Sequence, residues 1–296
     1  MILDSTKIKD YISCPRYYLL RHIFNWALET PPLPLGFGIA WHKAKEVVLD
    51  PGSRSPRDIA RALDMFLESY RGFYPDQDYD QNRFPRSPEG ALEGLLSYVR
   101  EYKDDSFKVV YCEEVGLIPL ASNLDLVFRA DAIIEDEKGR RWIVDSKTTG
   151  SSNPAYREVF NLSLQFDIYL IGVQQISLVE GLVVDVSEFK KKKDEVEVDH
   201  ERLYVLRSME DLEETIRELD LICGRIMEDT DLQVTGHSCA FPKSFSCIRF
   251  NRLCEYFDVC SSAVSWKDLD PESPPPGFVV REWDPLEREK KKEGGD

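Results

Sequence analysis

Two runs of β-branched and aromatic residues flank a short charged turn in the middle of the chain, and this segment constrains the fold most strongly. It covers residues 127–149 and reads VFRADAIIEDEKGRRWIVDSKTT. Such runs predict strands, and a tight turn centred near Lys138 would fold them back as an antiparallel hairpin. Asp131 and Asp145 lie at equal distances from Lys138 along the sequence. The hairpin would therefore place the two carboxylates opposite each other on neighbouring strands.

Side chains on a strand alternate between its two faces, so Lys147 shares a face with Asp145. Two carboxylates and one ammonium group would then meet at one point, where the carboxylates repel each other unless a cation lies between them. Oxygen ligands at a partly open site suit Mg²⁺ or Mn²⁺, and a nearby lysine can hold the water that attacks a phosphodiester. In the alternative interpretation, Lys147 only neutralises Asp145 at a solvated edge, because D-x-K tripeptides are common.

Patterns elsewhere in the chain indicate an α/β architecture. Before residue 107 the spacing of apolar residues predicts a helix capped by Ser5 and interrupted at Cys14-Pro15, a helix over 36–49, and two helices beginning at Ser55-Pro56 and Ser87-Pro88. The later elements are predicted strands over 109–115, 124–134, 141–144, 178–186 and 203–206, and predicted helices over 153–175 and 209–226. Their order predicts an α/β core with a helical N-terminal elaboration.

The charge and hydropathy of the chain exclude several classes of protein. Its 296 residues include 38 basic and 54 acidic side chains, which gives a formal charge of −16. Such acidity argues against a protein that coats nucleic acid nonspecifically, because that affinity comes from many Lys and Arg contacts to phosphate, but it does not exclude a nuclease. No apolar run approaches the ~20 residues that cross a bilayer, and the first residues lack a signal-peptide core. We therefore expect a cytoplasmic protein with no membrane partner.

Four short motifs follow one another along the chain in an order that matches a known nuclease family. They are Gly38-Ile-Ala-Trp-His42, Arg129-Ala-Asp131, Asp145-Ser-Lys147 and Gln165-Phe-Asp-Ile-Tyr169. Together with the opening Ser13-Cys14-Pro15-Arg16-Tyr17-Tyr18, this order resembles the PD-(D/E)XK nuclease superfamily and specifically its RecB-like branch, which includes CRISPR-adaptation and AddB-type nucleases. The resemblance covers nearly everything from Ser5 to Cys260. It implies a restriction-endonuclease-like core, with a mixed β-sheet flanked by helices.

The resemblance assigns a metal-binding role to three of these residues. Asp131 and Asp145, with the imidazole of His42, would bind Mg²⁺ or Mn²⁺, although a lone helical histidine is more often a packing or capping residue. The family often places a further glutamate on the strand before Asp131. Glu113 and Glu114 both occur there, and strand alternation allows only one of them to face the site.

The remaining catalytic residues follow from the same resemblance. Lys147 would position the attacking water. Gln165 and Tyr169 are four residues apart, so they share one helical face, where an amide and a phenol could contact the lysine, the substrate strand or both. Without the other motifs, they would be an ordinary amphipathic pair.

Four cysteines form a second candidate site. Cys247, Cys254 and Cys260 are spaced C-x6-C-x5-C, and Cys14 lies far upstream. Four thiolates can enclose an iron–sulfur cluster or a tetrahedral zinc ion. The resemblance implies a 4Fe-4S cluster held by these four residues, with zinc as the alternative. The first gap is wider than the family's C-x-x-C, which leaves Cys239 as an alternative ligand.

From these observations we expect a Mg/Mn-dependent deoxyribonuclease, an exonuclease acting on single-stranded or end-containing DNA in recombination, repair or mobile-element processing. A helicase or recombination partner is compatible with this function. The alternatives are a noncatalytic DNA-binding or complex-assembly subunit that keeps the nuclease fold, and a structure-specific endonuclease. The nuclease domain would cover residues 1–262, with its core at 107–230 and a cysteine staple at 14 and 247–260. Residues 263–296 are expected to form a linker and a charged tail.

Overall fold

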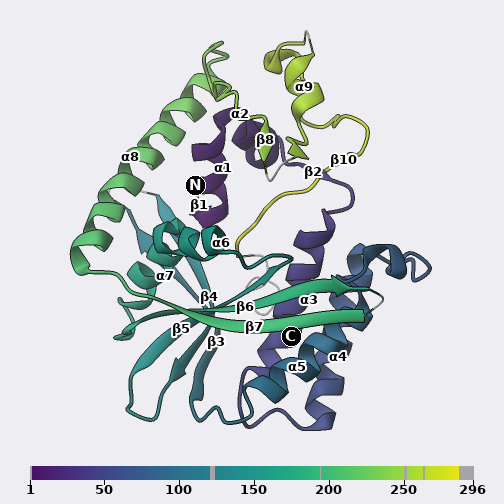
Figure 1. The fold of residues 1–296 in the computed structure, drawn as a ribbon. Helices are drawn as coiled ribbons and strands as arrows, with labels where there is room; N and C mark the ends of the chain where they lie inside the picture. The colour runs from purple at the N-terminus through teal and green to yellow at the C-terminus, as the bar shows by residue number, and fades with distance from the viewer. Residues whose placement is uncertain (1, 121–123, 194, 250–251, 263, 287–296) are drawn as a thin grey trace, which may run out of the picture. The chain divides into compact units, whose positions relative to one another are not determined.

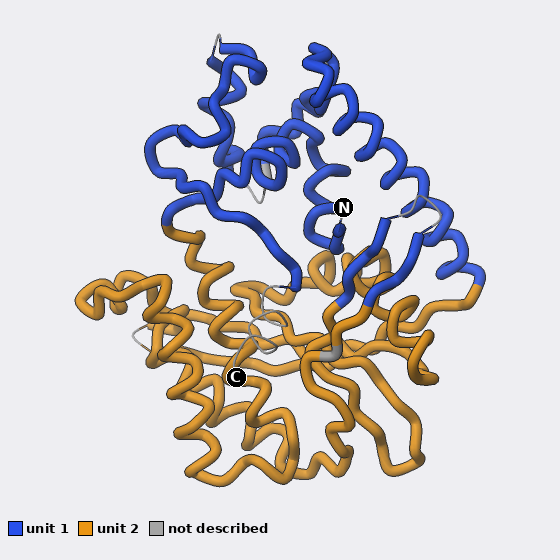
Figure 2. Tube along the Cα trace, turned by 180° about the vertical axis from the view of Figure 1, so that it is seen from behind, with its two compact units in different colours: residues 1–29, 117–128, 210–296 blue, residues 30–116, 129–209 orange. Residues whose placement is uncertain are grey.

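The computed structural model describes residues 2–120, 124–193, 195–249, 252–262 and 264–286. The chain folds into two compact units, blue and orange in Figure 2. Unit 1 comprises residues 1–29, 117–128 and 210–296, and unit 2 comprises residues 30–116 and 129–209. All residues predicted for the metal-dependent site belong to unit 2, and the four predicted cysteine ligands belong to unit 1.

A mixed β-sheet forms the centre of the fold, as the sequence predicted. Its strands are β1 (Ile2–Asp4), β3 (Lys108–Pro119), β4 (Asp125–Glu135), β5 (Arg141–Thr149), β6 (Gly181–Lys192) and β7 (Glu195–Val205). The order is β1-β4-β5-β6-β7, with β3 also paired to β4. β4 and β5 are antiparallel, whereas β5 and β6 are parallel. The parallel pair requires a crossover, and the chain makes it through α7 (Leu164–Val173).

The register between β4 and β5 agrees with the prediction. Ala132 pairs with Val144 and Glu135 with Arg141 across the hairpin, and Asp131 and Asp145 directly follow the last of these pairs. The turn is closed by the carboxylate of Asp136, whose Oδ1 accepts hydrogen bonds from the backbone N–H groups of the residues two and four positions later, at 2.9 and 3.0 Å. β5 extends past the predicted end at residue 144, which brings the D-S-K tripeptide inside the strand.

Three helices in unit 2 pack around one apolar core beside the β6–β7 hairpin. They are α3 (Leu33–Val48), α4 (Pro56–Phe73) and α5 (Pro88–Glu101) (Figure 1). Aromatic side chains dominate this core, namely Phe37, Trp41, Phe66, Tyr70, Tyr98 and Phe189. Both predicted caps are confirmed, because the hydroxyl of Ser55 accepts a hydrogen bond from the Asp58 N–H and that of Ser87 from the Gly90 N–H. A short 3₁₀ helix, η2 (Asp80–Arg83), precedes α5.

The prediction of one continuous helix over residues 153–175 is wrong. The structure has α6 (Pro154–Glu158), η3 (Val159–Leu162) and then α7. Ser163 separates η3 from α7, since its φ of −84° and ψ of 106° are extended rather than helical. α7 is buried on most sides, so its apolar residues follow no single stripe, and the apolar pattern could not reveal where the helix begins.

Unit 1 is built from helices and short strand pairs. Its elements are α1 (Ser5–Ser13), α2 (Pro15–Tyr18), η1 (Leu19–Ile23), β2 (Trp26–Leu28), α8 (Met209–Val234), β8 (Ile248–Arg249), β9 (Arg252–Leu253), α9 (Phe257–Ser261), η4 (Trp266–Asp268) and β10 (Phe278–Val280). The Tyr11 hydroxyl donates a 2.7 Å hydrogen bond to Asp229 and so ties α1 to α8. The predicted cap of α1 is wrong by one residue, because Asp4 rather than Ser5 accepts the hydrogen bond from the Lys7 N–H.

The C-terminal segment expected to be a linker and tail contains folded elements in unit 1. β10 pairs antiparallel with β2, and the indole of Trp283 donates a 2.7 Å hydrogen bond to Asp4. Residues 287–296 of the predicted tail lie outside the described residues. Of the helices that the structure describes, none combines the length and the apolar character needed to cross a membrane.

An ion pair is fully buried in the core of unit 2. The Lys45 Nζ lies 3.0 Å from Asp185 Oδ2, and the two side chains are 2% and 0% exposed. The Tyr98 hydroxyl donates a 2.7 Å hydrogen bond to the same oxygen. Burial lowers the pKa of Lys45 to about 8 despite the neighbouring carboxylate. Arg202 approaches the same carboxylate at 3.9 Å, so Lys45 is the nearer of two cations that balance the buried Asp185 charge.

We predict that Lys45→Met lowers the free energy of unfolding by about 3 kcal/mol, because it leaves the buried Asp185 charge with only the more distant Arg202, whose Nε lies 3.9 Å from Asp185 Oδ2. Adding Asp185→Asn should recover much of this loss, since both charges are then absent and the hydrogen bond from Tyr98 remains. Lys190→Met is the matched control, because the more exposed ion pair of Lys190 with Asp199 should contribute under about 1 kcal/mol. Urea denaturation measures all three variants. Equal losses in Lys45→Met and Lys190→Met would contradict the prediction.

Candidate active site

Asp145 and Lys147 lie on the same face of β5 and form an ion pair. The Lys147 Nζ is 2.8 Å from Asp145 Oδ2, and the two side chains are 25% and 1% exposed. Burial raises the pKa of Asp145, and the Asp131 carboxylate adds to this rise against the opposing charge of Lys147. The pair therefore combines a buried carboxylate with an ammonium group that solvent can reach.

Asp131 forms a second ion pair with His42. Its Oδ2 accepts a 2.8 Å hydrogen bond from the backbone N–H of Ser146 and lies 3.1 Å from the His42 Nδ1. Burial lowers the pKa of His42, but the charge and hydrogen bond of Asp131 outweigh burial and leave this pKa above its ordinary value. Conversely, burial raises the pKa of Asp131, and His42 brings it below its ordinary value. Each carboxylate of the predicted site thus has one cationic neighbour.

Gln165, near the start of α7, connects the first ion pair to Tyr169. The Gln165 side-chain oxygen accepts a hydrogen bond from the Lys147 Nζ at 3.3 Å, and its Nε2 donates to Asp145 Oδ1 at 3.4 Å. The same Nε2 lies 2.6 Å from the Tyr169 hydroxyl, one helical turn further along. The Gln165 amide thus contacts the lysine, which is one of the contacts that the sequence predicted for this helical face.

Gly38 lies where α3 passes close to β5, one helical turn before His42. A Cβ atom added at Gly38 would lie 3.4 Å from the Thr148 Oγ1 on β5, so the helix passes close to the strand at this point. His42 follows one turn later on the same face of the helix. At 3.4 Å the added Cβ would make an ordinary van der Waals contact with Thr148, so α3 and β5 are packed together at this position.

The glutamates of β3 are only partly described. The Glu113 carboxylate lies 3.0 Å from the Nζ of Lys43, which also contacts Glu46 at 2.7 Å. Lys43 follows His42 on α3, so Glu113 contacts the helix that carries the imidazole. The side chain of Glu114 lies outside the described part of the chain. Which of the two glutamates faces the site therefore stays open.

The chemistry of the site suits a divalent cation. Asp131, Asp145 and His42 offer oxygen and imidazole ligands, and the buried Asp145 Oδ2 accepts no well-directed hydrogen bond from described residues although Lys147 is near. Over those residues, no three His, Cys, Asp or Glu side chains are close enough to hold an ion as they now lie. A cation would thus draw the two aspartates partly out of their present ion pairs.

All four predicted cysteine ligands line one pocket of unit 1. The antiparallel pairing of β8 with β9 accounts for the six residues between Cys247 and Cys254, because it brings these two cysteines together. The Cys254 N–H donates a 2.8 Å hydrogen bond to the Cys247 carbonyl. Cys14 and Cys260 complete the set. Burial raises the pKa of the Cys14 thiol, but hydrogen bonds from Ser244 and the following backbone bring it below its ordinary value.

Cys239, the alternative ligand, is exposed and does not line this pocket. The spacing of the cysteines alone could not decide between Cys239 and the others, because it does not show that residues 248–249 pair with residues 252–253.

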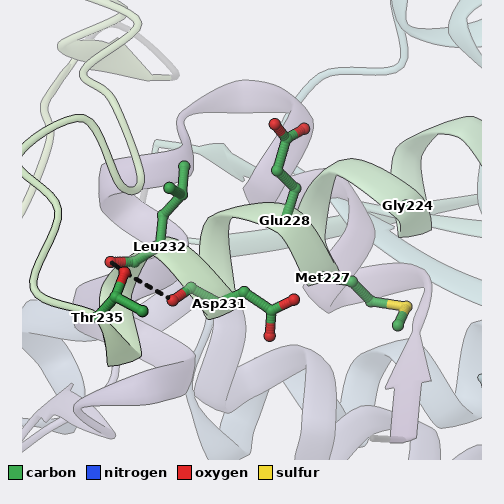
Figure 3. A pocket seen from close by; sticks show the side chains of 6 residues that line it. All are labelled: Gly224, Met227, Glu228, Asp231, Leu232 and Thr235. Carbon is green, nitrogen blue, oxygen red and sulfur yellow. Dashed lines mark hydrogen bonds between the residues drawn. The ribbon is translucent and has the colours of Figure 1, made fainter.

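Another pocket lies along one side of α8 (Figure 3). Its volume is about 580 Å³. Its lining residues are Gly224, Met227, Glu228, Asp231, Leu232 and Thr235. The Thr235 hydroxyl donates hydrogen bonds to the carbonyls of Asp231 and Leu232 in the last turn of α8. This groove has carboxylates but no lysine, histidine or cysteine, so it offers no constellation for catalysis.

The chain matches one protein-family model and resembles solved structures of low sequence identity. A sequence model of the PD-(D/E)XK nuclease superfamily matches residues 5–261, which include every residue predicted for the two sites. A candidate exonuclease from Eubacterium rectale is similar in structure over 77% of this chain and 80% of its own, with 14% identity and a TM-score of 0.42. The protein SSO0001 is similar over 64% of this chain and 74% of its own, with 16% identity and a TM-score of 0.27. No curated protein matches the chain.

We predict that Mn²⁺ raises the melting temperature of the protein, because an ion that binds only the folded state stabilises it by about 2.7 kcal/mol at 100 times its Kd. The rise should be lost in Asp131→Asn and Asp145→Asn. Asp199→Asn, which removes an exposed carboxylate of β7, should keep it. Differential scanning calorimetry with and without Mn²⁺ gives the comparison within each variant. The same Mn²⁺-induced rise in Asp145→Asn and in the parent protein would contradict the metal assignment.

Proposed function

The chain belongs to the PD-(D/E)XK nuclease superfamily, and we propose that it is a Mg²⁺- or Mn²⁺-dependent deoxyribonuclease. The observation that supports this most strongly is the ion pair of Lys147 with the buried Asp145, whose pKa the neighbouring Asp131 carboxylate helps to raise. Burying a carboxylate beside a second one is costly, so such a cluster is typical of a functional site rather than of a structural one.

Each residue of the site has a separate task in this proposal. Asp131 and Asp145, with His42, would hold the cation, which supplies charge stabilisation for the phosphate and lowers the pKa of water. Lys147 would orient the attacking water, because its ammonium group is partly exposed while Asp145 and Gln165 fix its position. Its ammonium group would hydrogen-bond that water and balance the negative charge at the scissile phosphate.

Gln165 and Tyr169 would act on the chemistry through Lys147. The amide of Gln165 accepts from Lys147 and donates toward Asp145, so it keeps both side chains in one orientation. Tyr169 in turn holds the amide through the short contact to Gln165 Nε2. A substitution at either position should misplace Lys147 without removing a charge.

We further propose that the enzyme belongs to the RecB-like branch and acts as an exonuclease on single-stranded or end-containing DNA. The four motifs in their order support this assignment, and so does the cysteine pocket of unit 1. Recombination, repair or mobile-element processing, with a helicase or recombination partner, would provide such substrates. A noncatalytic subunit would have no need for Lys147 beside two carboxylates.

The cysteine pocket is proposed to hold a 4Fe-4S cluster. Cys14, Cys247, Cys254 and Cys260 all line it, and the lowered pKa of Cys14 favours the thiolate that a metal requires. Such a cluster would close a chain loop of more than two hundred residues, which by loop-closure entropy would stabilise the fold by several kcal/mol, roughly as long disulfide loops do. Zinc is the alternative occupant.

We predict that Asp131→Ala, Asp145→Ala and Lys147→Ala each reduce DNA cleavage by about 10²-fold or more, since each removes a group that acts on charge in the transition state. His42→Ala should be milder and should raise the Mn²⁺ concentration needed. Lys138→Ala, at the exposed tip of the same hairpin, is the matched control and should cleave normally. Time courses with end-labelled single-stranded DNA measure these rates. Normal cleavage by Lys147→Ala would remove that residue from the proposal.

The same assay distinguishes the two types of nuclease when a linear strand is compared with a covalently closed circle of the same sequence. An exonuclease degrades the linear strand and leaves the circle intact. Cleavage of the circle would support the structure-specific endonuclease instead. If the parent protein binds both DNAs but cuts neither in Mn²⁺, the noncatalytic subunit is the correct function.

For the cysteine pocket, we predict that protein purified without oxygen is brown and carries about four irons per chain. Cys14→Ser should lose iron and solubility, because it frees the N-terminal helices from the C-terminal cysteines. Cys239→Ser is the matched control and should keep its iron. Iron analysis and visible absorption provide the readout. A colourless protein that contains zinc would show that the four cysteines hold zinc instead of the cluster. Iron loss in Cys239→Ser but not in Cys14→Ser would overturn the proposed ligand set.

A further inference from the structure

Arg86 is presented from a rigid piece of backbone in unit 2, between η2 and α5. Its N–H donates a 2.8 Å hydrogen bond to the Arg83 carbonyl, and its carbonyl accepts a 3.1 Å hydrogen bond from the buried Tyr70 hydroxyl. The next residue, Ser87, is the buried cap of α5. The position of Arg86 is therefore fixed by the fold rather than by its own side-chain contacts.

The guanidinium of Arg86 lies against the end of the catalytic strand. A Cβ atom added at Gly150 would lie 3.1 Å from the Arg86 Nη2. Gly150 directly follows β5 and comes three residues after Lys147, which corresponds to about 10 Å at the rise of a strand. The cation thus lies beside the same strand that carries Asp145 and Lys147.

No anion neutralises Arg86 within the described part of the chain. Its Nε–H is buried and has no hydrogen-bond acceptor there, and no described carboxylate forms an ion pair with it. By contrast, Arg71 and Arg83, in neighbouring elements, both pair with Asp80, at 2.5 and 3.3 Å. In a chain with 54 acidic and 38 basic residues, a half-buried guanidinium without a carboxylate indicates that an external anion completes the site.

Tyr156 on α6 adds a hydroxyl to the same place. It lies beside Thr149 and Arg86, and burial raises its pKa to about 12, with the Asp145 charge adding to the rise and Arg86 opposing it. The hydroxyl therefore remains protonated at neutral pH and can donate a hydrogen bond. A guanidinium fork beside a phenol suits a phosphate, because the fork binds two phosphate oxygens at once.

We propose that Arg86, assisted by the Tyr156 hydroxyl, binds a backbone phosphate of the DNA strand about three nucleotides from the cleaved bond, given 3.4 Å per nucleotide of a stacked strand. Arg86 is then a positioning residue that fixes the register of the strand on β5. The inference rests on the proposed nuclease function. It adds a substrate contact that none of the four motifs contains.

Binding to fluorescent single-stranded DNA tests this proposal in the Asp145→Asn background, where the strand stays intact. Arg86→Gln should raise the Kd about tenfold, because it removes a charge-assisted hydrogen bond. It should also lower the slope of log K against log salt by about 0.7, the value for one phosphate of a single strand. Arg100→Gln is the matched control, since this exposed arginine lies at the opposite end of α5. It should change neither quantity.

A scan of neutral methylphosphonate linkages along the strand locates the contact. In the Asp145→Asn protein, a methylphosphonate at one position should weaken binding. When Arg86→Gln is added to this protein, a methylphosphonate at the same position should weaken binding no further. Arg86→Lys should restore the salt slope but only part of the affinity, and Tyr156→Phe should weaken binding at that linkage alone. In the cleaving enzyme, Arg86→Gln should raise KM more than it lowers kcat. Circular dichroism melting checks that each variant folds.

The outcomes separate this inference from the function on which it rests. If the protein binds and cuts DNA while Arg86→Gln and Arg100→Gln have equal Kd values and salt slopes, the phosphate contact is wrong and the nuclease stands. Equal sensitivity to every methylphosphonate in both proteins would also overturn it. If the parent protein neither binds nor cuts DNA, the nuclease proposal fails first and takes this inference with it.

Discussion

The antiparallel register of β4 and β5 is the constraint on which the candidate site depends. Asp131 and Asp145 directly follow Ala132 and Val144, the last paired residues of the two strands, so the sheet brings the two carboxylates to the same end of the pairing. A slip of one residue would send one carboxylate to the opposite face. The Asp136 carboxylate stabilises the turn that sets this register, because it accepts hydrogen bonds from two backbone N–H groups of the turn and from the Arg140 side chain.

Charge balance determines how the site is arranged around this pair. Asp145 is matched by Lys147 and Asp131 by His42, so the aspartates can lie near each other in the protein alone. Gln165 bridges to the first pair from α7, a helix that is almost entirely buried. His42 lies on α3 and Lys147 lies on β5, so a bound cation can displace one of these side chains while the other keeps its position.

The sequence could predict those features that depend on neighbours along the chain. The caps at Ser55 and Ser87 and the β4–β5 register follow from turn and capping chemistry within a few residues. The break at Ser163 and the pairing of β10 with β2 could not be predicted, because they depend on packing with distant segments. For Arg86, neither periodicity nor a motif gave a signal, and only its approach to Gly150 reveals it.

We infer that Asp131 and Asp145 hold a cation that contacts the phosphate being cleaved. This contact can be tested by replacing one nonbridging oxygen of a terminal DNA linkage by sulfur and comparing cleavage rates in Mg²⁺ and Mn²⁺. Because Mn²⁺ accepts sulfur ligands more readily than Mg²⁺, we expect slow cleavage of this linkage in Mg²⁺ and recovery in Mn²⁺. Equal effects of sulfur in both metals, or cleavage that continues in chelator, would contradict it.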